Sequence, residues 1–275
     1  MSATPSENST IESWLLEQYA KQNCDDPWSF KRYSACRILR DSGIPCYLWA
    51  EDALHYYGVP TAVFDIYIIV DDVKKAVDAL SERGWKSPPP DYKPPYADIK
   101  GENYYLVEPQ CKSVGHFNPV VALMAASDWN IRLPDISAQT RCHPQKTAKW
   151  PFIPPLHELL DLCIQKWLDT PSTYSPVCDR IGCFIGYLYG NIPILKLREF
   201  AAYMKVENRQ YHFDVIAGVS YTRVPFRAHS QKVRDSIRRG DYEFRECSVS
   251  RDDERYFTAA AEARLLALLP PVNHA

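Results

Sequence analysis

Residues 44–70 read IPCYLWAEDALHYYGVPTAVFDIYIIV, and this stretch decides the fold of the 275-residue chain. The apolar run 45–49 predicts a short buried strand, and residues 51–57 predict a two-turn helix that Gly58 ends. Residues 63–70 are mostly β-branched or aromatic, which favours a second strand. The stretch therefore predicts a strand, a tight turn, a short helix and another strand.

Helices and strands alternate on both sides of this stretch. The spacing of apolar residues predicts a helix at 27–41, and Asp71 or Asp72 is expected to cap a helix at 73–83. Two further strands are expected at residues 103–107 and 119–125. Later helices are expected at residues 155–169, 179–189, 194–206 and 252–269. The predicted fold class is α/β (α+β), with a mixed sheet followed by a helical C-terminal region.

Proline-rich and polar stretches predict the domain organisation. Residues 1–26 are interpreted as a disordered or partly helical leader, 27–150 as an α/β domain and 151–275 as a mostly helical C-terminal region. Residues 87–95 read SPPPDYKPP, and five prolines in nine residues exclude a helix or a central strand there. This segment is expected to be an exposed loop that tolerates change.

Composition excludes several classes of protein. The 32 basic and 34 acidic residues give a net charge of -2, which argues against nucleic acid as a partner. No apolar run approaches the roughly 20 residues of a membrane span, and the N-terminus lacks the pattern of a signal peptide, so a cytoplasmic protein without membrane contact is expected. The nine cysteines form no CxxC pair and the seven histidines show no metal-binding spacing, so no metal ligands are predicted.

The pattern of residues 44–70 resembles the nucleotidyltransferase superfamily, which is also called polymerase-β-like. In that family a strand ends in a hydrophobe-Gly-Gly or hydrophobe-Gly-Ser turn that holds nucleotide phosphates. A following strand presents Asp-x-Asp, whose two carboxylates share a face and bind two divalent ions. A later strand supplies a third carboxylate. The resemblance covers roughly residues 27–125.

The resemblance assigns site residues one by one. Trp49 takes the position of the hydrophobe, and Ala50 and Glu51 take those of the two small residues. Asp65 takes the first carboxylate position, whereas Tyr67 stands where the second carboxylate is expected. The strand at 119–125 carries no carboxylate. A phenol is a poor magnesium ligand, so these departures predict that the two-metal centre is incomplete.

Physical chemistry gives the same residues other interpretations. Glu51 and Asp52 lie in the first turn of a helix, where carboxylates favour the helix dipole. Asp65 interrupts an apolar strand, and alternation predicts that it faces the same cleft as Tyr67. Asp65, Tyr67 and Glu51 are therefore the candidate catalytic residues, able to form an acid/base cluster without metal.

Further residues are candidates for ligand binding. Beside Trp49, Ala50 and Asp52, the candidates are Lys166, which could reach a phosphate from its helix, and His116, which precedes the last predicted strand. A solvated helix lysine and a hydrogen-bonded loop histidine are the plainer interpretations of these two. The basic stretch 223–239 is expected to be a solvated face paired with acidic residues 241–254.

Three functions remain open at this point. The first is a divergent nucleotidyltransferase-fold protein that binds a small molecule or nucleotide beside Asp65. The second is a metal-free acid/base enzyme of the cyclase or isomerase type. The third is a non-catalytic interaction protein that keeps only the fold. Magnesium and a nucleoside triphosphate are expected as cofactors only if the family activity survives. The sequence does not determine the substrate or the oligomeric state.

Overall fold

The computed structural model describes residues 11, 13–14, 32–92, 104–109, 119–133, 153–170, 176–220, 224–250 and 253. The predicted leader up to residue 10, the boundary near residue 150 and most of the helix expected at 252–269 lie outside the described residues. Ile11, within the predicted leader, is helical and fully buried against the core.

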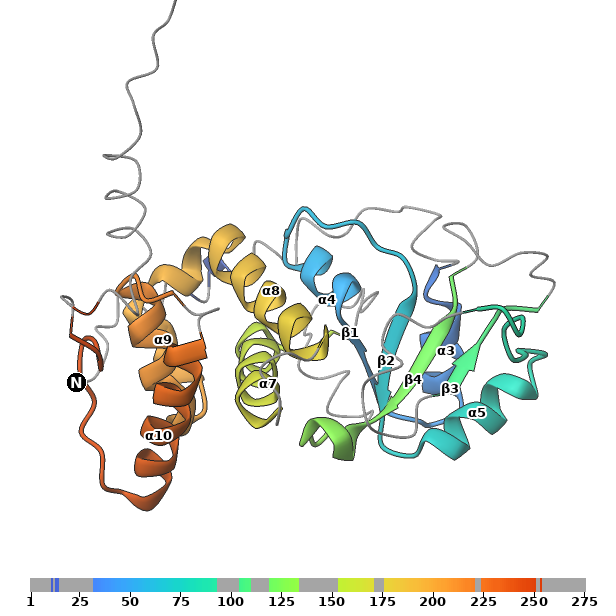
Figure 1. The fold of residues 1–275 in the computed structure, drawn as a ribbon. Coiled ribbons are helices and arrows are strands. Elements are labelled where there is room, and N and C mark those ends of the chain that lie inside the picture. The colour runs from blue at the N-terminus through green and yellow to red at the C-terminus, as the bar shows by residue number, and fades with distance from the viewer. Residues whose placement is uncertain are drawn as a thin grey trace, which may run out of the picture.

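A mixed sheet of four strands confirms the α/β fold class (Figure 1). Its strands are β1 (Cys46–Trp49), β2 (Ile66–Val70), β3 (Tyr104–Leu106) and β4 (Val121–Ala125), in the order β1-β2-β4-β3. The β1 strand pairs with β2 antiparallel, β2 pairs with β4 parallel, and β4 pairs with β3 antiparallel. The prediction that 46–49 and the run ending at Val70 are neighbouring strands of one sheet is therefore confirmed.

The strand predicted at 63–70 is shorter than expected. Residues 63–65 lie outside β2, which begins at Ile66, so Asp65 stands one residue before the strand. The short helix between the strands, α4 (Glu51–Tyr56), agrees with the prediction. So does α5 (Val73–Ser81), because the Asp72 carboxylate caps it by accepting the Lys75 backbone N–H at 2.9 Å.

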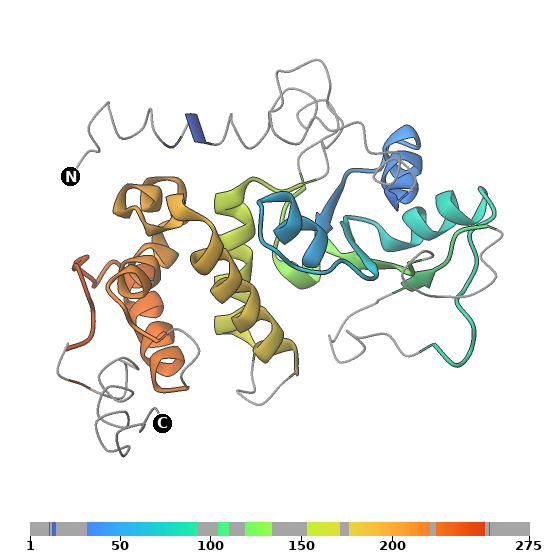
Figure 2. The ribbon, with the colours of Figure 1, turned by 90° about the horizontal axis from the view of Figure 1, so that it is seen from above.

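Helices cover both faces of the sheet (Figure 2). On one side, α3 (Ser34–Asp41) packs against β1, and α5 packs against α3 and β4. On the other side lie α7 (Leu156–Asp169) and α8 (Pro176–Asn191), which pack together, and α8 also contacts α4. The two helices α9 (Arg209–Ile216) and α10 (Val224–Arg239) lie beyond α7 and α8, away from the sheet (Figure 1).

The helix predicted at 194–206 is wrong in type. The segment forms three short 3₁₀ turns, η2 (Pro193–Lys196), η3 (Arg198–Tyr203) and η4 (Val206–Asn208). Pro193 begins the first turn, where its missing N–H costs nothing. A further 3₁₀ turn, η1 (Ala126–Trp129), follows β4.

The expectation that residues 223–239 form a solvated face is wrong for two arginines of this stretch. Arg227 and Arg234 of α10 are only 4% and 7% exposed. Arg227 donates through Nε to the Trp167 carbonyl at 2.8 Å and through Nη2 to the Thr170 carbonyl. Arg234 forms an ion pair with Asp169 at 2.7 Å. Arg227 therefore satisfies carbonyls at the C-terminal end of α7, and both positive charges interact favourably with the helix dipole there. The predicted acidic pairing is seen at the end of α10, where Arg239 meets Asp241 at 3.2 Å.

No helix of the described chain is long and apolar enough to span a membrane.

Candidate functional site

The turn between β1 and α4 has an unusual backbone. Ala50 has φ 57° and ψ −135°, a conformation that glycine adopts readily and that residues with a Cβ rarely adopt. Ala50 is also buried, with 1% of its surface exposed. Strained residues of this kind persist only where the surroundings hold them, and they cluster at functional sites.

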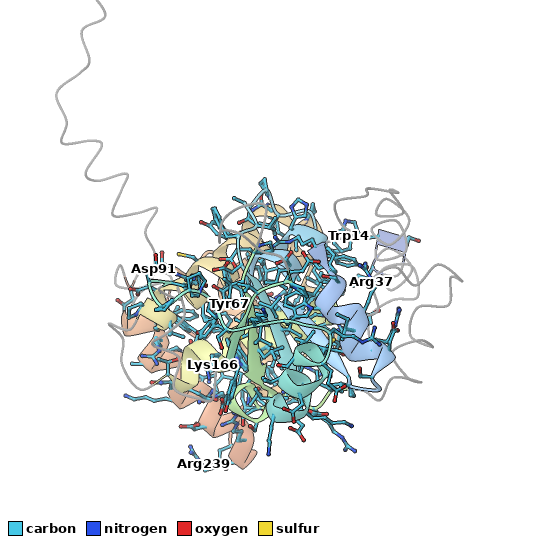
Figure 3. The ribbon with its side chains drawn as sticks, turned by 90° about the vertical axis from the view of Figure 1, so that its right-hand side faces the viewer. Trp14, Arg37, Tyr67, Asp91, Lys166 and Arg239 are labelled. Carbon is cyan, nitrogen blue, oxygen red and sulfur yellow. The ribbon has the colours of Figure 1, made fainter. Side chains whose placement is uncertain are left out.

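The sheet brings Asp65 to the same edge as this turn. Because β1 runs antiparallel to β2, the end of β1 lies beside the start of β2, and Trp49 pairs with Tyr67. Asp65 precedes the start of β2. Tyr67 itself is buried, and Figure 3 shows it among the side chains in the middle of the molecule, whereas Arg239 lies at the rim.

Two hydrogen bonds hold the Asp65 carboxylate. Its Oδ1 accepts the Val120 backbone N–H at 3.0 Å, and its Oδ2 accepts the Tyr92 hydroxyl at 2.6 Å. Burial, and after it this bond, raise the pKa of the Tyr92 phenol. The expected shared face of Asp65 and Tyr67 stays a prediction, since Tyr92 and Val120 are the residues that donate to the Asp65 carboxylate.

Tyr92 was missed by the sequence analysis, because it lies in the proline-rich segment 87–95. Ser87, Pro89, Pro90 and Asp91 are exposed, as predicted for this loop, but Tyr92 is only partly exposed. Residues 93–95 lie outside the described residues. No local pattern predicts a hydrogen bond between residues 27 positions apart in the chain.

Glu51 adds a second carboxylate near Asp65. Burial raises the pKa of Glu51, and the negative charges of Asp52 and Asp65 raise it further, while Arg180 of α8 lowers it. Arg180 is a second residue that the sequence analysis missed. A partly buried carboxyl with a raised pKa can exchange a proton closer to neutral pH than an ordinary glutamate.

Asp52 anchors the site. Its side chain is fully buried and accepts two bonds from Arg32, from Nε at 2.8 Å and Nη2 at 2.9 Å, and one from the Tyr33 hydroxyl at 2.7 Å. Arg32 also donates to the carbonyls of Phe64, at 2.9 Å, and Asp65, at 3.4 Å. The ion pair therefore connects α4 to the segment that carries Asp65.

Trp49 is buried and Lys166 of α7 is half-buried, and both pack on Trp129. The Trp49 ring is 1% exposed and packs on Trp129, with ring centroids 4.7 Å apart. Lys166 donates to the Asp128 carbonyl at 2.6 Å, and its Nζ lies 4.8 Å from the centroid of the Trp129 ring. Burial lowers the Lys166 pKa. None of these contacts of Trp49 and Lys166 involves Asp65. His116 lies outside the described residues.

The side chains near Asp65 do not fit the two-metal centre of the nucleotidyltransferases. The second carboxylate position is held by Tyr67, and its neighbour on the parallel strand β4 is Ala122. Across the described parts of the chain, no group of three or more His, Cys, Asp or Glu side chains is placed to hold a metal ion. Magnesium prefers several hard anionic oxygens, and here one carboxylate is already bonded to two donors of the chain.

Comparisons with protein-family models, with curated proteins and with solved structures gave no match.

Proposed function

We propose that this chain is a divergent nucleotidyltransferase-fold protein that binds a nucleotide or related small molecule beside Asp65, without a two-metal centre. The observation that carries the proposal is the backbone of Ala50, at φ 57° and ψ −135°. The resemblance places glycine at this position. The chain keeps a conformation suited to glycine although alanine is strained in it, which supports a retained role for the turn.

The topology around the turn supports the same proposal. The order β1, α4, β2 and the later strand β4 of the same sheet agree with the arrangement expected from the resemblance. The turn and Asp65 lie at one edge of the sheet, and the charges of Asp65 and of Arg180 from α8 both act on Glu51. Arg180 could bind an anionic group of the ligand, while the two carboxylates could accept hydrogen bonds from its hydroxyl or amino groups.

Isothermal titration calorimetry with ATP, GTP, CTP and UTP, each with and without magnesium, tests the proposal. We expect saturable binding of at least one nucleotide, with little dependence on magnesium. Asp65→Asn should weaken that binding at least about tenfold, because the amide replaces an acceptor with a donor. Asp78→Asn, on the exposed face of α5, is the matched control and should bind like the wild type. Unchanged binding in Asp65→Asn would contradict the proposal.

A second function is favoured by the half-buried position of Glu51 near Asp65, where burial raises the pKa of Glu51. In this version the site is a metal-free acid/base enzyme. Glu51 would take and return the proton of a small organic substrate, and Asp65 would orient the substrate. Magnesium-independent turnover that is lost in Glu51→Gln, with substrate binding retained, would favour this second function over binding alone.

A further inference from the structure

Tyr92 occupies one oxygen of the proposed ligand-binding carboxylate. The distance of 2.6 Å between its hydroxyl and Asp65 Oδ2 is short for a hydrogen bond and typical of a bond to a charged acceptor. The other oxygen, Oδ1, is held by the backbone N–H of Val120. A carboxylate oxygen can accept two hydrogen bonds, so a ligand that donates to Asp65 Oδ2 either shares this oxygen with the Tyr92 hydroxyl or replaces that hydroxyl.

The loop is built to hold Tyr92 in this place. The Tyr92 backbone N–H donates to the Pro89 carbonyl at 3.0 Å, which closes a turn. The three prolines 88–90 restrict the backbone before this turn, so little entropy is lost when the loop places Tyr92 on Asp65. At the start of the loop, Lys86 pairs with Val107 beside β3. The centroid of the Tyr92 ring lies 6.1 Å from that of the Tyr105 ring of β3.

We propose that Tyr92 is an internal competitor for the ligand and a specificity-determining residue of the site. This inference rests on the proposed function. The ligand group that displaces Tyr92 is a hydrogen-bond donor, such as a hydroxyl or amino group, because an ionised carboxylate only accepts hydrogen bonds. A bare phosphate oxygen cannot take the place of the phenol, since two acceptors facing each other repel. The sugar or base of a nucleotide, rather than its phosphates, is therefore the part that meets Asp65.

The test compares the full chain with Tyr92→Phe, which removes the hydroxyl and keeps the ring. Tyr187→Phe is the matched control, because Tyr187 is a half-exposed tyrosine on α8. ATP and adenosine are titrated into each protein by calorimetry. We expect Tyr92→Phe to bind both about tenfold more tightly, since the ligand no longer displaces a bond to a charged group. Tyr187→Phe should bind like the wild type.

A second measurement follows Tyr92 directly. The chain is labelled with 3-fluorotyrosine, and the fluorine resonance of Tyr92 is the one that disappears in Tyr92→Phe. We expect saturating ATP or adenosine to shift this resonance, because its hydroxyl leaves Asp65. The resonance of Tyr187, assigned in the same way, should stay in place.

The possible failures are distinguishable. If the wild type binds and Tyr92→Phe binds equally or more weakly, with an unmoved Tyr92 resonance, the competition is overturned and the proposed function stands. If neither protein binds ATP or adenosine, the inference and nucleotide binding at this site are overturned together.

Discussion

Replacement of Asp52 by alanine should destabilise the protein strongly. The carboxylate is fully buried and accepts three hydrogen bonds, two from Arg32 and one from Tyr33. The substitution leaves the Arg32 guanidinium, whose side chain is only 11% exposed, without its counter-charge. Removing one partner of a buried ion pair typically costs about 3–5 kcal/mol, a large part of the roughly 5–15 kcal/mol that stabilises a domain.

The chain offers a matched control for this change. Arg40 and Asp41 form an ion pair at 3.1 Å, with side chains that are 37% and 60% exposed. Exposed pairs contribute about 0–1 kcal/mol, so Asp41→Ala should change the free energy of unfolding by less than about 1 kcal/mol. Urea denaturation at pH 7, followed by circular dichroism, measures both variants against the wild type.

A double variant separates loss of the pair from the cost of an unpaired charge. Arg32→Met combined with Asp52→Leu removes both charges and should recover part of the stability lost in Asp52→Ala. A loss of stability in Asp52→Ala no larger than that in Asp41→Ala would contradict this prediction. That result would mean that the bonds to Asp52 do not hold α4 against the segment before β2, and would return Asp52 to the candidate ligand-binding residues.

Two further predictions concern the turn and its neighbour. Ala50→Gly should change the free energy of unfolding by less than about 1 kcal/mol, because relief of the strained backbone offsets the lost methyl group and the added entropy of the unfolded chain. Ala53→Gly, inside α4, should lower the free energy of unfolding by about 1–2 kcal/mol more than Ala50→Gly does in the same urea assay. Equal losses in the two variants would exclude strain at Ala50. Glu51→Gln should raise Tm at pH 7. Burial raises the pKa of Glu51, so the folded state loses stability as pH rises from the ordinary glutamate pKa through the raised pKa of the folded state. The gain in Tm should therefore vanish below the ordinary glutamate pKa. A gain in Tm that is the same at pH 3 and pH 7 would contradict this sign.

Local patterns in the sequence predict much of the sheet. Residues 46–49 and 66–70 are apolar runs between turn-forming residues, and their pairing follows from the short helix between them. The cap of α5 by Asp72 depends on a neighbour three residues away, so it is readable from the chain. The 3₁₀ turns at 193–208 were missed, because their apolar spacing resembles that of an α-helix and only packing distinguishes the two.

The candidate site was predictable only in part. The resemblance indicated Ala50, Glu51 and Asp65, and the structure places Asp65 at the edge of the sheet where the turn lies. The partners Tyr92 and Arg32 come from distant segments, and nothing in their local sequence indicates which carboxylate they meet. Long-range polar contacts are set by the topology, which has to be known before they can be predicted.

The end of α7 restricts how the chain can be shortened. Its carbonyls at Trp167, Leu168 and Thr170 accept hydrogen bonds from Arg227 and Gln231, which lie on a helix that begins more than fifty residues later. A fragment that stopped after α8 would lose these donors and the packing of α10 on α7, and the end of α7 would be exposed to water. Dissection of the protein into a sheet-bearing piece and a helical piece should therefore yield a first piece that frays at α7, and complementation by the separate α9–α10 segment should restore it.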